Sequence, residues 1–172
     1  MWRTNVALIG FMGAGKSTVG PALAARLGKT FVETDALVEQ RTGMAIADVF
    51  SRYGEQYFRE LEAAVVQDVA KSRECVISCG GGVVLREDNV SALRTSAVLV
   101  HLEVSPQAVL ERLSPRSIER PLLNGPDREQ RVSELMERRR PLYAAAADFT
   151  LATDGLCVED IVDGVEERLA RQ

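Results

Sequence analysis

The sequence predicts an α/β fold, with one central parallel sheet of about five strands covered by helices on both faces. Short apolar runs alternate with segments of helical periodicity along the 172 residues, which is typical of βαβ units. A glycine-rich phosphate-binding pattern at 10–18 also lies between the first apolar run and the first helical segment. A chain of this length is expected to form a single domain, 1–172.

The composition is typical of an ordinary globular protein. Apolar residues make up 46% of the chain and charged residues 27%. The formal net charge of −4 argues against a general binder of nucleic acids or membrane surfaces. The three cysteines form no Cys-x-x-Cys pair, which suits reduced thiols. Neither a signal sequence nor a long apolar span is evident, so we expect a cytoplasmic protein.

The first strand, loop and helix are the clearest elements of the chain. Residues 5–9 form a short apolar run, as expected of a buried parallel strand. Beyond the loop, apolar residues recur at helical spacing until Gly28, a residue type that commonly ends helices. The order of strand, glycine-rich loop and helix is the context in which this pattern binds phosphate.

The later elements follow from the same two periodicities. We expect further strands at 29–35, 75–79, 97–102 and 149–153. We expect helices at 36–41, from 45 to a break at Gly54, from there to 69, and at 88–93, 106–113, 128–145 and 158–169. Pro141 is expected to bend or end its helix. Residues 114–126 carry prolines, a glycine and charges with little periodicity, which predicts a mobile loop.

The glycine-rich loop predicts that the chain binds a nucleoside triphosphate. Its glycines let backbone N–H groups curl around an anion, and the following helix points its positive end at the same anion. Lys16 is placed to reach the β- and γ-phosphates, and the Ser17 hydroxyl is placed to complete a Mg²⁺ shell. The alternative is a glycine-rich turn with an accidental lysine, and the correct flanks on both sides argue against it.

Two charged residues have a structural explanation beside the functional one. Asp35 lies at the end of the second predicted strand, where a carboxylate could orient an attacking hydroxyl and accept its proton. Aspartate is equally favoured as a helix N-cap, so the residues alone leave its role open. Arg59 lies in a predicted helix, and position alone favours a surface ion pair with Glu55 or Glu62.

Three consecutive glycines, Gly80, Gly81 and Gly82, follow the third predicted strand. Such a run costs folding entropy and is tolerated best where the backbone passes close to another group. At the ligand end of the sheet that group would be a substrate, and the alternative is a loose turn. Farther along, Arg120 lies in the predicted mobile loop, from which it could reach the phosphates as a lid closes.

Several other polar residues fit structural roles. The three arginines at 138–140 lie near a predicted helix end, and most of them are explained by stabilisation of that end. His101 is the only histidine and lies within an apolar strand, so we expect a core histidine. Cys75 and Cys79 lie at the two ends of the third strand, and we expect inert buried thiols.

A series of motifs, in order along nearly the whole chain, resembles the shikimate kinase family. The motifs are the loop at 10–20, the acidic strand end at 31–35, the helical segments at 41–43 and 46–50, the segment 54–59, the glycine triplet, and the segments 120–123 and 139–143. The resemblance implies a three-layer P-loop kinase fold with substrate-side helices at about 35–61 and a lid at about 114–126. It also implies transfer of the γ-phosphoryl group of ATP to the 3-hydroxyl of shikimate, in the biosynthesis of aromatic amino acids.

The resemblance implies a role for each candidate residue. Asp35 corresponds to the carboxylate that holds the reacting hydroxyl, and Arg59 with Arg139 to the pair that grips the substrate carboxylate. Gly81, within its triplet Gly80 to Gly82, corresponds to a backbone contact with the substrate. The residues implied to bind ATP are Gly13, Ala14, Gly15, Lys16, Ser17, Thr18, Arg112 and Arg120, of which Lys16 and Arg120, together with Asp35, are the implied catalytic residues.

Two positions depart from the family pattern. Glu33 stands where the family usually has an aspartate that holds a Mg²⁺-bound water, so the resemblance implies that Glu33 acts through water. The implied direct ligand of the metal is Ser17. The stretch from Arg112 to Arg120 is one residue longer than the commoner form. This difference leaves open whether Arg112 stacks on adenine.

Two other functions are alternatives. A kinase of another hydroxy acid, such as gluconate, would share the fold but would not need Arg59 and Arg139 in these contexts. A regulatory protein that only binds nucleotide would not need to keep Lys16, Ser17, Asp35 and Arg120 together. We therefore expect an ATP-dependent kinase that acts as a monomer on shikimate, uses Mg²⁺, and has no nucleic-acid or membrane partner.

Overall fold

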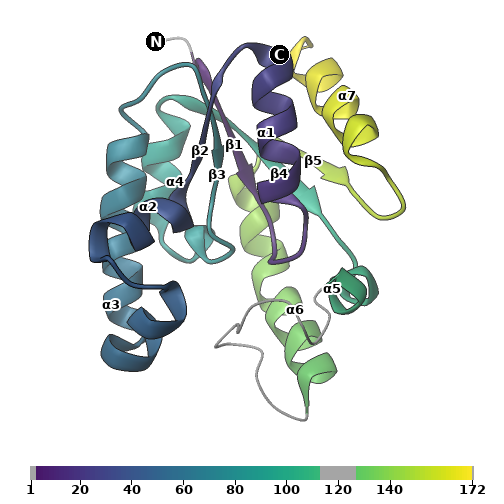
Figure 1. Ribbon diagram of the computed structural model, residues 1–172. Helices are drawn as coiled ribbons and strands as arrows, with labels where there is room; N and C mark the ends of the chain where they lie inside the picture. The colour runs from purple at the N-terminus through teal and green to yellow at the C-terminus, as the bar shows by residue number, and fades with distance from the viewer. Residues whose placement is uncertain (1–2, 113–126, 172) are drawn as a thin grey trace.

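The computed structural model contains one parallel sheet of five strands between two layers of helices (Figure 1). It describes residues 3–112 and 127–171. The strands are β1 (Asn5–Ile9), β2 (Thr30–Glu33), β3 (Cys75–Ser78), β4 (Ala97–Glu103) and β5 (Phe149–Ala152). Their order across the sheet is β2-β3-β1-β4-β5, and every neighbouring pair is parallel. The predicted fold class is confirmed.

Helices cover both faces of this sheet. They are α1 (Lys16–Leu27), α2 (Thr34–Thr42), α3 (Ile46–Val69), the short 3₁₀ helix η1 (Val83–Leu85), α4 (Glu87–Arg94), α5 (Pro106–Arg112), α6 (Arg128–Ala146) and α7 (Val158–Leu169). Helices α1 and α7 contact each other on one face, while α4 and α6 contact β4 on the other face, where α3 lies beside α4 (Figure 1). No helix in the two described segments is long and apolar enough to cross a membrane.

The middle strands of the sheet hold the hydrophobic core. Every residue of β1 and β3 is buried, whereas the edge strands β2 and β5 are partly exposed. Strands covered on both faces are apolar along most of their length, and this explains why these two were clear in the sequence, although Asn5 and Ser78 are polar. Because all five strands are parallel, their carboxyl ends meet at one edge of the sheet. The loops that follow β1, β2 and β3 therefore lie side by side.

The break predicted at Gly54 lies within α3. Its φ of 82° and ψ of 173° are far from helical values and divide α3 into two helical segments. Glycine reaches a positive φ at little cost, so the chain can change direction here and continue as a helix. The second segment runs along the sheet as far as Val69, as the periodicity predicted.

The predicted second strand, 29–35, is too long. The four residues of β2 pair with the four residues of β3, and the pairing ends at Glu33. Thr34 then begins α2, with Glu33 as the residue that precedes the helix. Asp35 therefore lies in the first turn of α2, where a carboxylate is favourable, and is neither a strand residue nor the N-cap.

Helix α6 ends at Ala146, one residue past the predicted range 128–145, so Pro141 does not end the helix. Tyr143 and Ala146 lie beyond the proline and are 2% and 3% exposed. Burial of these side chains against the body outweighs the hydrogen bond that proline removes. Helix η1 was not predicted because three residues are too few to show a period. The predicted loop at 114–126 lies outside the described residues.

Candidate active site

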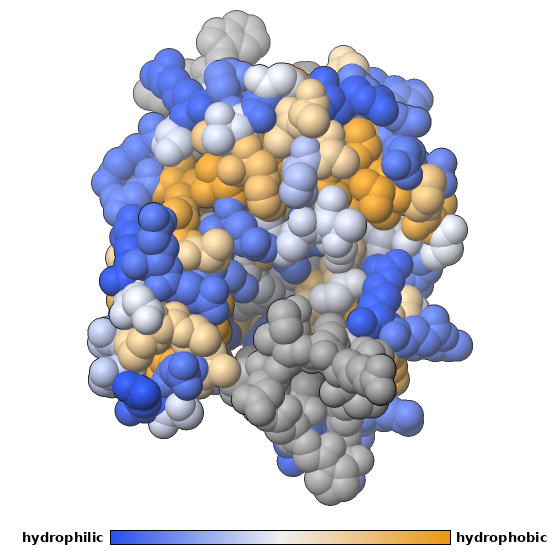
Figure 2. Space-filling view, viewed as in Figure 1, coloured by the Kyte–Doolittle hydropathy of each residue, from blue (hydrophilic) through white to orange (hydrophobic). Residues whose placement is uncertain are grey.

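A cleft of about 500 Å³ opens at the carboxyl ends of β1, β2 and β3, where parallel sheets place their ligands. Its walls come from the glycine-rich loop, the glycine triplet, α2, α3 and α6. Figure 2 shows the surface hollowed beside the lobe that carries α2 and the first part of α3. The candidate residues Asp35, Arg59 and Arg139 all line this cleft.

The glycine-rich loop connects β1 to α1, as predicted. Gly10 has a φ of 146°, and a Cβ there would lie 2.5 Å from the carbonyl oxygen of Leu102 on β4, so only glycine fits. Lys16 is the first residue of α1 and is 8% exposed. Its Nζ lies 2.8 Å from the carbonyl oxygen of Gly10 and 2.9 Å from that of Phe11. The ammonium group is thus held over the loop, at the helix end that attracts anions.

Ser17 and Glu33, the two residues expected at the metal, lie together beside the loop. The Ser17 hydroxyl donates a hydrogen bond to the Glu33 carboxylate at the end of β2. Hydroxyl and carboxylate oxygens are the hard ligands that Mg²⁺ prefers. The described part of the chain holds no cluster of three or more His, Cys, Asp or Glu side chains suited to a metal ion. The donor set therefore fits a metal that takes most of its ligands from phosphate and water.

The glycine triplet makes room for charged side chains. A Cβ at Gly80 would lie 2.6 Å from both Asp35 Oδ1 and Glu62 Oε1. A Cβ at Gly82 would overlap the guanidinium group of Arg59. The triplet is therefore not a loose turn, because its backbone passes close to side chains of the protein itself. Backbone contact between the triplet and a substrate stays a prediction.

Arg59 forms the ion pairs with Glu55 and Glu62 that its position in the helix suggested. Its side chain is largely buried, however, and not on the surface. Its guanidinium lies 2.8 Å from Glu62 and 3.0 Å from Glu55, and its side chain is 12% exposed. The group also lies 5.1 Å from the centre of the Phe58 ring. Burial by itself lowers the pKa of Arg59, but the two carboxylates outweigh burial and raise it. The cleft thus holds a permanent positive charge that is fixed in place.

Glu62 is a site residue that sequence reasoning treated only as a surface partner of Arg59. Its side chain is 1% exposed and lies beneath the cleft floor at Gly80. Burial raises the pKa of Glu62, although Arg59 lowers it. The helical period carried the missing signal: Phe58 and Val65 are buried, and Glu62 lies between them on the same stripe of α3. An acid on an apolar stripe needs a charged partner inside the fold.

Arg139 differs from its two arginine neighbours. It is 4% exposed, whereas Arg138 and Arg140 are exposed on α6. Its Nη1 donates to the carbonyl oxygen of Gly81 at 3.3 Å, and its guanidinium lies 5.9 Å from the centre of the Phe11 ring. The structure therefore brings Arg139 to the same stretch of backbone as Arg59, which is distant in sequence.

Arg112, the last residue of α5, contacts the glycine-rich loop. One of its nitrogens donates to the carbonyl oxygen of Gly13 at 3.0 Å and another to that of Thr153 at 3.2 Å. The side chain thus links the glycine-rich loop to the residue that follows β5. Arg120, the other arginine assigned to ATP, lies outside the described residues.

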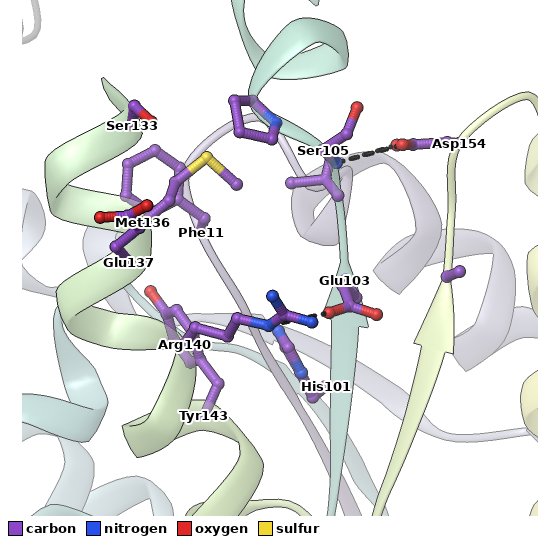
Figure 3. Close-up of a pocket in the computed structure, with 13 residues that line it drawn as sticks. Phe11, His101, Glu103, Ser105, Ser133, Met136, Glu137, Arg140, Tyr143 and Asp154 are labelled. Atoms are coloured by element: carbon purple, nitrogen blue, oxygen red, sulfur yellow. Dashed lines mark hydrogen bonds and ion pairs between the residues drawn. The ribbon is translucent and has the colours of Figure 1, made fainter. Parts of the chain in front are cut away.

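A second cavity, of about 440 Å³, lies between β4 and α6 (Figure 3). Phe11, His101 and Tyr143 border it. His101 is 5% exposed, as expected of a core histidine, and burial lowers its pKa. Its Nδ1 lies 3.3 Å from the Thr150 hydroxyl, so the ring has a polar partner inside the fold.

Comparison with known proteins gives consistent matches over nearly the whole chain. A family model described as shikimate kinase matches residues 12–170. A shikimate kinase of Dehalococcoides mccartyi is 41% identical over 97% of this chain and 94% of its own, and one of Moorella thermoacetica is 44% identical over 96% and 94%. The solved structure of an Acinetobacter baumannii shikimate kinase in complex with shikimate superposes with a TM-score of 0.94 at 32% identity, covering 98% of this chain and 93% of that one.

Proposed function

The chain belongs to the shikimate kinase family, and we propose how its residues divide the work of that reaction. Membership makes the chain an ATP-dependent kinase, which transfers the γ-phosphoryl group of ATP to the 3-hydroxyl of shikimate and gives 3-phosphoshikimate and ADP. The product serves the biosynthesis of chorismate and the aromatic amino acids. The family model and the relatives of more than 40% identity are described as shikimate kinases, and neither alternative, a gluconate kinase or a purely regulatory protein, is among these descriptions.

Two largely buried arginines, Arg59 and Arg139, are the residues proposed to bind the carboxylate of the substrate. Arg59 lies against Gly82, and Arg139 donates to the carbonyl of Gly81, so the two guanidinium groups flank consecutive residues of one backbone segment. Both arginines are largely removed from water, which strengthens charge-assisted hydrogen bonds to a bound carboxylate. A planar guanidinium fits the two oxygens of a carboxylate better than an ammonium group does.

Asp35 is the residue proposed to hold the reacting hydroxyl. It lines the same cleft, and its carboxylate lies beside the backbone of Gly80. A carboxylate at this place can accept a hydrogen bond from the 3-hydroxyl and take its proton as the oxygen attacks. With its carboxylate held by Arg59 and Arg139 and its hydroxyl by Asp35, shikimate presents one oxygen in one orientation, which lowers the entropic part of the barrier.

The glycine-rich loop and Lys16 are proposed to bind the ATP phosphates. Backbone N–H groups of 13–18 surround the anion, and Lys16 stabilises the charge that develops on the transferred group. Arg112 extends this site toward the end of β5, where it already bridges two backbone carbonyls. Arg120 is proposed as a further phosphate contact on the strength of the family resemblance alone.

Mg²⁺ is the metal that this donor set fits, with Ser17 as a direct ligand and Glu33 acting through a bound water. When bound with ATP, the ion neutralises charge on the phosphate oxygens. The hydrogen bond from Ser17 to Glu33 holds the serine oxygen beside the loop. The carboxylate thereby orients the hydroxyl that would meet the metal.

Turnover by the purified chain tests this assignment. With ATP and Mg²⁺, the chain is expected to phosphorylate shikimate and to leave gluconate unchanged at the same concentration. Gluconate as the better substrate, or shikimate turnover at the background rate, would contradict the proposal. We also propose that the chain acts as a monomer. Light scattering coupled to gel filtration checks that point separately, and a stable dimer would contradict it.

A further inference from the structure

Tyr143 holds the same backbone carbonyl as Arg139. The two residues lie four positions apart on α6, so their side chains leave the same face of the helix. Tyr143 Oη donates to the carbonyl oxygen of Gly81 at 2.5 Å, and Arg139 Nη1 donates to the same oxygen at 3.3 Å. Because Tyr143 is only 2% exposed, little water competes for this bond.

His101 keeps the ring of Tyr143 in place. The two rings stack with their centroids 5.0 Å apart and their planes inclined by 17°, and Figure 3 shows them facing each other from α6 and β4. The bond between His101 and Thr150 ties this stack to β5 as well. Burial raises the pKa of Tyr143 to about 12, although Arg139 lowers it, so the hydroxyl keeps its proton and remains a donor.

The glycine triplet needs an anchor of this kind. Three glycines in succession restrain the backbone very little by themselves, and ordering them costs conformational entropy. The interactions that offset this cost must therefore come from outside the triplet. The described peptide bonds are all trans, so a fixed carbonyl at Gly81 also fixes the plane of the following peptide and the direction of the Gly82 N–H. The same carbonyl occupies one N–H of Arg139, which restricts the orientation of the guanidinium.

We propose that Tyr143 is a positioning residue for shikimate, acting through the Gly81 carbonyl that it shares with Arg139. The inference rests on the proposed function, because it takes the cleft as the shikimate site. Tyr143 itself borders the second cavity and not the cleft, so its effect on the substrate is exerted through Gly81 and Arg139. His101 supports this arrangement by holding the tyrosine ring.

The variant Tyr143→Phe tests the proposal, because it keeps the ring and its stacking and removes only the donor. Loss of one buried hydrogen bond predicts a rise of about three- to tenfold in the dissociation constant for shikimate. The affinity for ATP should stay close to wild type, and the melting temperature should fall by only a few degrees. Tyr53→Phe is the matched control, since that side chain is 52% exposed, and it should change none of the three quantities.

Calorimetric titration of shikimate and of ATP, with the melting temperature, separates the outcomes. Wild-type affinity for shikimate in Tyr143→Phe would overturn the proposal, and so would an equal loss of both affinities, which would indicate a packing role. His101→Phe, which keeps a ring for stacking but loses the bond to Thr150, should weaken shikimate binding by less and leave ATP binding unchanged. If wild type itself fails to bind shikimate, the proposed function is wrong; if only the variant result fails, this inference alone is wrong.

Discussion

The two ends of the cleft, proposed to bind the phosphates of ATP and shikimate and called the phosphate end and the shikimate end, are built in different ways. The phosphate end is centred on one continuous stretch of chain, 10–18, in which backbone groups and a single lysine are proposed to surround the anion. The shikimate end combines Arg59 on α3, the glycine triplet after β3, and Arg139 on α6. These parts are distant in sequence and meet only in the folded chain.

This difference shows what each kind of site requires. A backbone anion site needs local geometry, supplied by glycine conformations and a helix N-terminus. The pair Arg59 and Arg139, called the clamp below, comes from distant parts of the chain. Such a pair needs partners that hold each charge in place before the substrate binds. Glu62 and Glu55 hold Arg59, and the Gly81 carbonyl holds Arg139. We therefore expect changes at the phosphate end to affect phosphoryl transfer, and changes at the shikimate end to affect shikimate affinity.

The largest expected effect tests the phosphate end. Lys16→Ala should abolish phosphoryl transfer, because it removes charge stabilisation worth several kcal/mol in the transition state. Measurement of kcat with saturating substrates checks this. A variant that keeps more than about a tenth of wild-type kcat would contradict the assignment, since tenfold corresponds to only about 1.4 kcal/mol. Lys71→Ala is the matched control, because its side chain is 76% exposed, and it should keep full activity.

The next effect tests the shikimate end. Arg59→Ala and Arg139→Ala should each weaken shikimate binding about ten- to a hundredfold, because a charge-assisted contact contributes roughly 1.5–3 kcal/mol. Affinity for ATP should barely change, since the loop around Lys16 is intact. Calorimetric titration of shikimate, with and without nucleotide, measures both. Arg138→Ala removes an exposed neighbouring arginine and should leave shikimate affinity unchanged.

Two further variants test whether Arg59 and Arg139 bind the same carboxylate. Arg139→Lys should recover only part of the loss, because an ammonium group cannot reproduce the two-pronged geometry. The double variant of Arg59 and Arg139 should lose less than the sum of the single variants, because both act on one carboxylate. Wild-type shikimate affinity in both single variants would place the carboxylate elsewhere and reopen the substrate assignment.

The same contrast explains how much could be predicted from the sequence. The sheet, most of the helices and the phosphate loop depend on local patterns, so they were predicted closely; α7 begins and ends at the predicted residues because both signals lie in the helix itself. The end of β2 was missed because it depends on pairing with β3. Helix α6 was predicted as far as 145 and ends at Ala146, but the sequence could not decide whether Pro141 ends it, because the course of the chain beyond the proline depends on packing against the body of the protein.

At the shikimate end the sequence identified the parts but not their arrangement. The ion-pair partners of Arg59 were named correctly, yet its burial depends on how α3 packs against the triplet, which no local pattern contains. The burial of Glu62 had a local signal, its place on the apolar stripe of α3, but the prediction did not use it. The proposed role of Tyr143 had no local signal, because its hydroxyl contacts Gly81, which is distant in sequence.

A smaller effect tests whether the triplet exists to make room for the clamp. Gly82→Ala should weaken shikimate binding by about tenfold, because the new Cβ overlaps the Arg59 guanidinium and displaces this flexible side chain from Glu62. ATP affinity should be unchanged. Gly81→Ala is the comparison, since its nearest neighbour would be the Met12 backbone nitrogen at 3.4 Å, and it should cost less. Equal shikimate affinity in Gly82→Ala and wild type would mean that the triplet does not serve Arg59.

The smallest expected effect returns to the phosphate end, at a side chain that comes from a second strand, β2. Glu33 reaches from the end of β2 to the Ser17 hydroxyl, and an aspartate is one methylene shorter. In Glu33→Asp the hydroxyl should lose part of this support, so half-maximal activity should require about two- to fivefold more Mg²⁺. The Michaelis constant for shikimate should stay unchanged, because Glu33 makes no part of the clamp. Magnesium titrations of activity at saturating shikimate measure the shift, with Glu87→Asp on the exposed face of α4 as the matched control. If the titrations of Glu33→Asp and wild type superimpose, Glu33 has no role at the metal, and the Ser17 hydroxyl needs no support from β2.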